Sequence, residues 1–400
     1  MTSSNPAAVA KAIFAGCVVA FLGFGFAAAF GVFLQPISDE LGWGRQVFSL
    51  SVALQMLFWG LTQPFAGAVA DRSGTARVLA VGCVFAAAGF ALRAAVPDST
   101  VFAVAGVLVG IGTGACSFTI VIVALGKVVP EARRSLIMGL GTAAASLGMF
   151  VGAPASVQLI DWLGWRDAIL AIAASYLAIL PFLVCIARVS EPTAAGSGLA
   201  GFRSAVGSAF RDRSYVCLFV GFFVCGFHVA FIQTHLPAYL TDLGLAAGLG
   251  AVALALIGLL NIAGSFLSGW SGQVMSKKKV LAGIYFARSV VIAAFILVPL
   301  SPTSVAVFAA AIGLLWLSTV PLTTGLVAQT QGLTYLSTLA GLVFLSHQVG
   351  SFLGAWMGGW IYDLTRDYSL VWWTAVALGL FAAIVHLPIR EQVPQPAAAE

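Results

Sequence analysis

Long apolar runs, separated by short polar or charged segments, repeat along the whole chain. A helix needs about 20 mostly apolar residues to cross the roughly 30 Å hydrocarbon core of a bilayer. Strands of a transmembrane barrel would be about ten residues long with alternating polarity, a pattern that is missing from this chain. We therefore predict an all-α membrane protein. The runs predict twelve membrane-spanning helices, at 12–34, 47–70, 78–96, 101–126, 135–160, 167–187, 215–240, 250–274, 280–300, 304–328, 337–362 and 369–388.

Composition agrees with this pattern and narrows the class of protein. Hydrophobic residues make up 60% of the 400 residues, charged residues only 8%, and the mean hydropathy is +1.03. Soluble domains carry roughly a quarter charged residues, so a soluble enzyme is excluded. The formal net charge of +5 does not require a nucleic-acid partner, because basic residues gather beside membrane spans.

The basic residues are distributed unequally between the two sides of the predicted membrane. The loops opposite the termini hold only Arg45, Arg166 and Arg366. Under the positive-inside rule, this places both termini in the cytoplasm and the protein in the cytoplasmic (inner) membrane. The side of the termini carries Lys11, Arg72, Arg77, Lys127, Arg133, Arg134, Arg188, Arg203, Arg211, Arg213, Lys277, Lys278, Lys279 and Arg390.

The chain divides into two similar halves. A polar, glycine-containing stretch at 188–214 separates six predicted spans in 1–187 from six in 215–400, and we interpret it as a cytoplasmic linker. An ungapped shift of 202 positions superposes Gly148, Phe150 and Gly152 on Gly350, Phe352 and Gly354. Such repeats are typical of secondary transporters, whose substrate sites lie near the midplane between the repeats.

The loop between the second and third predicted spans contains a recognisable motif. Gly67, Asp71, Arg72 and Gly74 follow one another as G-x-x-x-D-R-x-G, which resembles the corresponding loop of the major facilitator superfamily. Together with twelve spans, a central linker and the repeat, this resemblance covers the whole chain. It implies two six-helix bundles and transport by alternating access. It also implies that the four residues form a conformational latch near the cytoplasmic end of the eleventh span.

Within that superfamily, the chain looks most like the monocarboxylate and oxalate/formate branch and its bacterial relatives. The resemblance rests on the sequences at 31–36 and 41–45, and on the stretch at 64–67 that leads into the motif. It implies a small organic anion as substrate, chiefly a monocarboxylate. Animal carriers of this branch have an Asp and an Arg four residues apart in the eighth span. Asn261 and Ser265 stand at the aligned positions, so efflux of apolar or weakly basic compounds remains an alternative.

Polar residues inside the predicted spans are the candidates for contact with a substrate or a proton. Arg288 lies about 13 Å into its span and is either a counter-ion for a carboxylate or a structural tie to a neighbouring helix. Arg93, near the outer end of the third span, is expected to snorkel to the surface. No Asp or Glu lies deep in a span, so any proton would be carried by histidine. The candidates are His228, His347, Gln348, Asn261, Arg288, Gln55, Ser117, Thr119 and His235.

The sequence contains no nucleotide-binding loop, metal-ligand cluster or nucleophile–base pair. We therefore expect a monomeric carrier without enzymatic activity or cofactor. It would be driven by a gradient and have a small molecule, protons and the bilayer as partners. A non-transporting sensor or assembly factor is the alternative from another class, and against it we expect no appended signalling domain.

Overall fold

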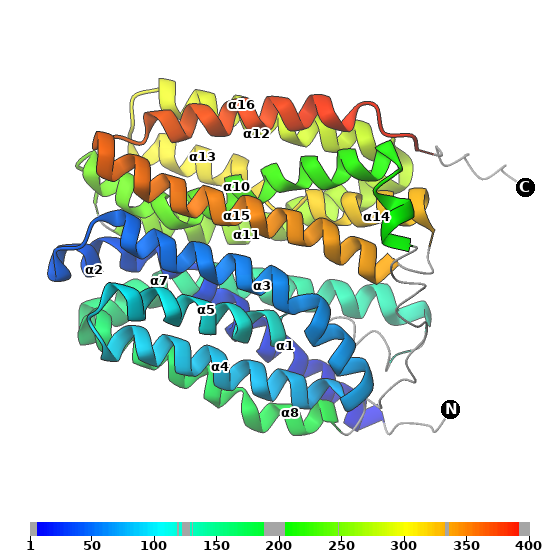
Figure 1. Ribbon diagram of the computed structural model, residues 1–400, viewed down its shortest axis with the longest axis horizontal. Helices are drawn as coiled ribbons and strands as arrows, with labels where there is room; N and C mark the ends of the chain where they lie inside the picture. Colours follow the sequence, from blue (N-terminus) through cyan, green and yellow to red (C-terminus); the bar gives the residue numbers. More distant parts are fainter. Residues whose placement is uncertain are drawn as a thin grey trace, which may run out of the picture.

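The structure is a computed structural model that describes residues 6–117, 120–121, 129, 131–187, 205–246, 248–332 and 336–391. All regular elements in these ranges are helices, so the predicted all-α class is confirmed (Figure 1). The helices are α1 (Pro6–Ala28), η1 (Phe30–Phe33), α2 (Leu34–Leu41), α3 (Arg45–Ser73), α4 (Thr75–Ala95), α5 (Ser99–Ala115), α7 (Glu131–Ala178), α8 (Leu180–Ala187), α10 (Arg213–Asp242), α11 (Gly248–Val274), α12 (Lys277–Leu297), α13 (Pro302–Leu315), α14 (Thr319–Gln331), α15 (Leu336–Thr365) and α16 (Ser369–His386).

The helices match the predicted spans within the described residues, but they are joined differently at several places. The predicted span 12–34 is made mainly of α1 and η1, and residues 118–119 and 122–126 of the predicted span 101–126 lie outside the described residues. In the described part of the chain, ten helical segments are long and apolar enough to cross a membrane, and Ser99–Ala115 is shorter. One segment, Gly139–Ala187, covers two predicted spans because the chain turns back at Gly164, where φ is 78° (Figure 1). The predicted span 304–328 is interrupted in its middle and forms α13 and α14.

The helices before and after the linker lie in two halves of the molecule (Figure 1). We call α1–α8 the N half and α10–α16 the C half. Helix α3 packs against α15, α7 against α11, and η1 against α10, and these pairs connect the halves. Helix α1 begins and α16 ends at one end of the molecule, which we call the terminal end, and α2 lies at the opposite, far end (Figure 1).

The repeat seen in the sequence recurs in the helix contacts. A Cβ atom added to Gly148 of α7 would overlap the carbonyl oxygen of Phe21 in α1. A Cβ atom added to Gly350 of α15 would overlap the carbonyl oxygen of Phe223 in α10. The shift of 202 positions that relates Gly148 to Gly350 also relates Phe21 to Phe223. Small residues therefore allow equivalent close helix contacts in each half.

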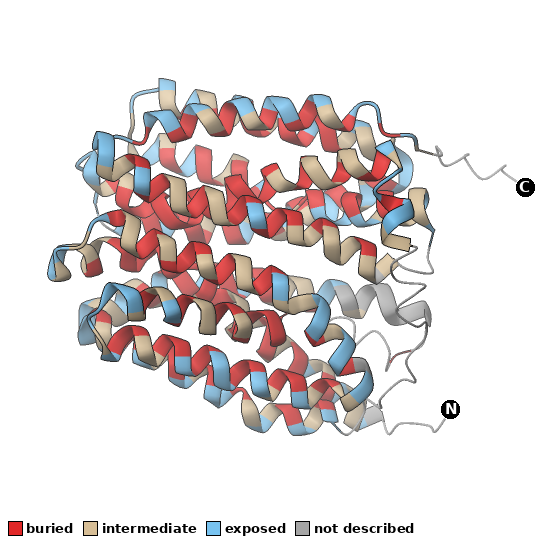
Figure 2. Cartoon of the chain, viewed as in Figure 1, coloured by how far each residue is buried: buried red, intermediate tan, exposed pale blue. Residues whose placement is uncertain are grey.

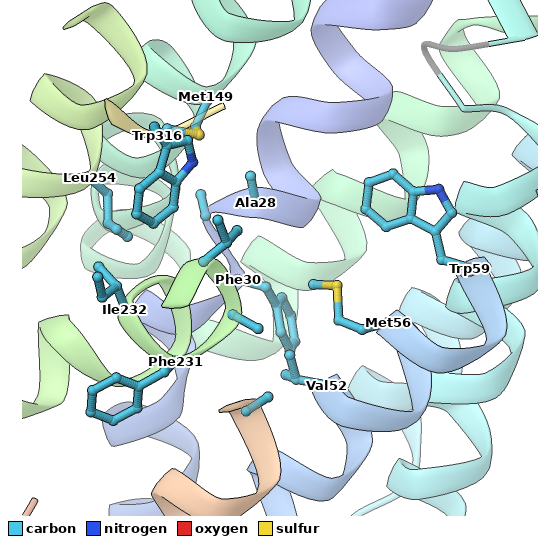
Figure 3. Close-up of a cluster of buried hydrophobic side chains, with 14 of the residues drawn as sticks. Ala28, Phe30, Val52, Met56, Trp59, Met149, Phe231, Ile232, Leu254 and Trp316 are labelled. Atoms are coloured by element: carbon cyan, nitrogen blue, oxygen red, sulfur yellow. The ribbon is translucent and has the colours of Figure 1, made fainter. Parts of the chain in front are cut away.

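Burial follows the membrane setting. Buried residues run along the inside of the bundle, and exposed ones lie along its outer faces (Figure 2). Large apolar side chains such as Phe65, Phe266 and Trp162 are exposed, as expected for surfaces that face lipid. Figure 3 shows a buried apolar cluster that draws on both halves. It includes Phe30, Met56 and Trp59 from the N half and Phe231, Ile232, Leu254 and Trp316 from the C half.

Candidate functional site

Two buried N–H donors, one from each half, lie at the contact between α3 and α15. Trp59 of α3 is 7% exposed and Gln348 of α15 is 1% exposed. The indole Nε1 of Trp59 and the amide Nε2 of Gln348 have no acceptor among the described residues. A Cβ atom on Gly60 would stand 2.6 Å from Cβ of Gln348, and the Trp59 ring lies 6.2 Å from that of Phe344. The contact between α3 and α15 therefore carries one unpaired buried donor from each half, and N–H donors of this kind can bind an anionic acceptor.

Neighbouring residues of α15 orient the Gln348 amide. Its Oε1 lies 3.0 Å from Nδ1 of His347 and accepts a hydrogen bond of 3.3 Å from Oγ of Ser351. The His347 ring stacks on Phe344 at 5.5 Å and lies 4.9 Å from the ring of Phe222 in α10. Because the amide oxygen is already engaged, the amide nitrogen is left as the free group.

Ser117 belongs to the same region. Together with Thr113, Phe24 and Trp59, it lines a cavity of about 10 Å³ inside the N half. This volume is close to the minimum for a single water molecule. The structure therefore places Ser117 beside Trp59, whereas Thr119 lies outside the described residues.

Gln55 accepts from a buried arginine through its Oε1, while its Nε2 has no partner among the described residues. Arg93 donates from Nη1 to Oε1 of Gln55 at 3.0 Å and from Nη2 to Oγ of Ser51 at 2.9 Å. Its guanidinium also lies 4.5 Å from the ring centroid of Phe30. The prediction that Arg93 snorkels to the surface is wrong, since this residue is only 1% exposed. Polar partners on α3 and an aromatic face hold the guanidinium inside the N half.

Arg288 is tied to backbone groups in the C half. Its Nη2 donates to the carbonyl oxygen of Leu315 at 2.6 Å. The same Nη2 also donates to the carbonyl oxygen of Trp316. Nη1 lies 3.4 Å from Sγ of Cys225. Of the two alternatives left open by the sequence, these contacts favour the structural tie.

Asn261 lies on the interface between the halves. This fully buried residue of α11 donates from Nδ2 to Oγ of Ser146 in α7 at 3.1 Å. Its Oδ1 accepts from the backbone N–H of Leu317 at 2.9 Å and from Oγ of Ser265 at 3.2 Å. The amide thus connects the N half to the interruption between α13 and α14.

The other two histidines lie away from Trp59 and Gln348. His228 bonds through Nε2 to the carbonyl oxygen of Ala375 at 2.7 Å, inside the C half. His235 bonds through Nε2 to the carbonyl oxygen of Ala355 at 2.7 Å, and its Nδ1 lies 3.2 Å from the hydroxyl of Tyr368. Of the three candidate histidines, His347 is the one that contacts Gln348.

A second polar connection between the halves lies at the far end, and we call it the Arg45 clamp. Arg45 begins α3 and forms a bidentate ion pair with Asp242 of α10, with both N–O distances at 2.6 Å. The guanidinium also donates to the Tyr368 hydroxyl at 2.8 Å and lies 3.8 Å from the ring centroid of Tyr362. From the sequence, Arg45 was a basic residue of an outer loop and the last residue of the 41–45 stretch that resembles the branch, and its role in the clamp was not predicted.

Asp363 of α15 completes the clamp by capping α3. Its two carboxylate oxygens accept from the backbone N–H groups of Arg45 at 2.9 Å and Gln46 at 2.8 Å. A carboxylate at this position satisfies free amides and interacts favourably with the positive end of the helix dipole. Asp363 of the C half therefore caps the N-terminus of α3 in the N half. The sequence contained a signal for this cap. Asp161 and Asp363 are related by the shift of 202 positions, and each lies at the end of a predicted span.

Comparison with protein families decides what kind of protein carries this arrangement. The model of the Major Facilitator Superfamily matches residues 15–355. The chain belongs to the major facilitator superfamily. It is therefore a multi-pass membrane transporter with the all-α fold of that superfamily.

Individual relatives within the major facilitator superfamily include bacterial and animal proteins. An uncharacterized MFS-type transporter, YcxA of Bacillus subtilis, is 26% identical, and the match covers 92% of each chain. Monocarboxylate transporter 13 of Rattus norvegicus is 26% identical over 87% of this chain and 81% of the relative. Monocarboxylate transporter 11 of Homo sapiens is 26% identical over 93% of this chain and 81% of the relative.

The motif that resembles the superfamily loop forms the turn between α3 and α4. Gly74 ends α3 with φ of 95°, a conformation that strongly favours glycine, and Arg72 is exposed. A Cβ atom on Gly67 would meet nothing within 4 Å. The side chain of Asp71 lies outside the described part of the structure, so the latch remains a prediction.

Proposed function

We propose that the protein is a secondary transporter that moves a small organic anion, chiefly a monocarboxylate, by alternating access. The observation that carries the proposal is the pair of free donors, Trp59 Nε1 and Gln348 Nε2, which come from opposite halves. An anion bound to both would connect the N half to the C half, and its binding energy would then depend on how close the halves are. This dependence is what links substrate binding to a conformational cycle.

The charge of the interior supports an anion. The buried charged side chains in the described residues are Arg45, Arg93 and Arg288, and no described carboxylate is buried. Arg93 and Arg288 have only neutral partners in the described structure, so both halves carry positive charge inside. The names of the animal relatives point to the same substrate class.

The proposed cycle moves residues 1–187 against residues 215–400, with 188–214 as the linker. We place the terminal end in the cytoplasm and the protein in the cytoplasmic membrane, because most basic residues outside the spans lie on that side. We further propose that the carrier works as a monomer, since both free donors belong to one chain.

The substrate assignment can be tested with the purified protein in proteoliposomes. Uptake and exchange should be measured for a panel of radiolabelled monocarboxylates, dicarboxylates and lipophilic amines. We expect monocarboxylates to be carried, because two neutral donors match one carboxylate group. Transport of amines alone would support the efflux alternative, and failure of every carboxylate would refute the proposal.

Proton coupling, if present, is expected to depend on His347. The His347→Gln variant should retain transport but lose most of its pH dependence, because glutamine keeps a polar side chain that does not bind a proton. The matched control is His228→Gln, since His228 is bonded to Ala375 inside the C half and should leave the pH profile unchanged. Cys225 and Arg288, which lie 3.4 Å apart, are present in both variants. An identical pH profile in wild type and His347→Gln would contradict this role.

A further inference from the structure

The interruption between α13 and α14 lies in the middle of a membrane span, where free backbone groups must find partners inside the protein. Side chains of two neighbouring helices supply these partners. Arg288 of α12 binds the carbonyl oxygens of Leu315 and Trp316, and Ser268 of α11 binds that of Ser318. Asn261 of α11 accepts the N–H of Leu317 at 2.9 Å. Side chains of α11 and α12 therefore hold the backbone of the interruption in one conformation.

Asn261 differs from the other two side chains because it also binds the opposite half. Its Nδ2 donates to Ser146 of α7 at 3.1 Å, whereas the hydrogen bonds that Arg288 and Ser268 form with described residues stay within the C half. Ser146 and Asn261 are both buried, so water does not readily replace this bond. Helices α7 and α11 also touch at backbone level nearby, where a Cβ atom on Gly258 would lie 2.8 Å from the backbone nitrogen of Phe150.

The geometry of the amide links these two contacts. Nδ2 and Oδ1 belong to one planar group and cannot reorient independently. When α7 moves away from α11, Ser146 withdraws and leaves a buried donor without an acceptor, which is unfavourable. A rotation that gives Nδ2 a new partner also takes Oδ1 away from the N–H of Leu317. The backbone at 316–318 would then lose one of its external supports.

We propose that Asn261 is a positioning residue that couples separation of the two halves to the backbone conformation of the α13–α14 interruption. The proposal rests on the alternating movement described under the proposed function, but it does not depend on which substrate is carried. In the present conformation Ser146 holds the Asn261 amide, and the amide holds Leu317. After separation, α14 is free to change its angle to α13 and to open or close the terminal end of the C half.

Hydrogen–deuterium exchange of the full chain in lipid nanodiscs, without added substrate, tests this coupling. The Ser146→Ala variant removes only the bond between the halves and touches no residue of the interruption. We expect exchange in the peptide containing Leu317–Thr319 to become roughly two- to tenfold faster, as for loss of one hydrogen bond. Ser146→Thr retains the hydroxyl and should restore slow exchange.

Two further variants separate coupling from a purely structural role. Asn261→Ala should also accelerate exchange at Leu317, because it removes the acceptor itself. Ser265→Ala removes a bond to the same Oδ1 from within α11 and should have no effect. Acceleration in Asn261→Ala but not in Ser146→Ala would reduce Asn261 to a local tie and overturn the proposal. Equal acceleration in Ser146→Ala and Ser265→Ala, or none in Asn261→Ala, would overturn it as well. Because no substrate is present, these outcomes are independent of a failed monocarboxylate assay.

Discussion

Replacing Arg45 with alanine should shift the transporter toward a conformation that is open at the far end. The variant loses the bidentate pair with Asp242 and the bond to Tyr368, both of which connect the halves. The Arg45 side chain is 10% exposed and that of Asp242 is 23% exposed, so the pair is largely shielded from water. A hydrogen-bonded charge in such a position contributes about 1.5–3 kcal/mol. The population of the open form should therefore rise roughly 10- to 100-fold.

A cysteine at Ser49 can report this opening. Ser49 is buried on α3, and a Cβ atom on Gly359 of α15 would overlap its Oγ, so the position is covered by the other half. Ser49→Cys should react slowly with a membrane-impermeant maleimide added on the far side, and faster when Arg45→Ala is added. The protein with its six natural cysteines gives the background rate.

A second arginine at the same end controls for the loss of a positive charge without the loss of a contact between the halves. Arg166 forms an ion pair with Glu40 at 3.3 Å, but both residues belong to the N half and are exposed. Arg166→Ala should therefore leave the labelling of Cys at position 49 unchanged, since exposed pairs contribute little and this one does not join the halves. Asp242→Asn should resemble Arg45→Ala. Equal labelling in Arg45→Ala and Arg166→Ala would contradict the role of the clamp.

Under the proposed function, replacing Trp59 with phenylalanine should weaken binding of the anionic substrate by roughly 10- to 100-fold. Phenylalanine preserves the aromatic contact with Phe344 but removes the free Nε1 donor. A hydrogen bond to a charged acceptor contributes about 1.5–3 kcal/mol, and the substitution removes one such bond from the bound state. The effect should appear in the Kd of a monocarboxylate that the proteoliposome assay shows to be carried, measured by isothermal titration calorimetry on the purified transporter.

Trp372 provides a control of the same chemistry. It is also buried and its Nε1 also lacks a described acceptor, but it packs among Phe231, Phe295 and Phe308 inside the C half. Trp372→Phe should leave the Kd unchanged. If both variants bind the anion as tightly as the wild type, Trp59 is not part of the anion site.

The sequence predicted the helices and the repeat well because both depend on local composition. Apolar runs of membrane length are visible residue by residue, and the shift of 202 positions recurs in the contacts of Gly148 and Gly350. His347 and Gln348 could be singled out because polar side chains are rare in an apolar run. The interruption between α13 and α14 was missed, although Pro321 gives a local signal. Proline lacks an N–H and fits the first turn of α14 better than the middle of one long helix.

The remaining features depend on distant partners and could not be read from the pattern. Trp59 is one of ten tryptophans, and its indole nitrogen is notable only because no acceptor lies near it. Arg45 meets Asp242 across 197 positions and Asp363 across 318 positions. Arg93 was placed by its depth alone, but its partners on α3 make an interior position favourable. Each of these depends on how the helices pack against one another.

The cap that Asp363 places on α3 has a consequence for the electric field of an opened far end. In the present conformation, which is closed at the far end, the first backbone N–H groups of α3 bind the carboxylate of Asp363. The Arg45 guanidinium binds the carboxylate of Asp242. Separating the halves leaves these groups on opposite walls of the entrance, positive along the N half and negative along the C half. An entering anion would then be steered along the α3 wall, which leads inward to Trp59.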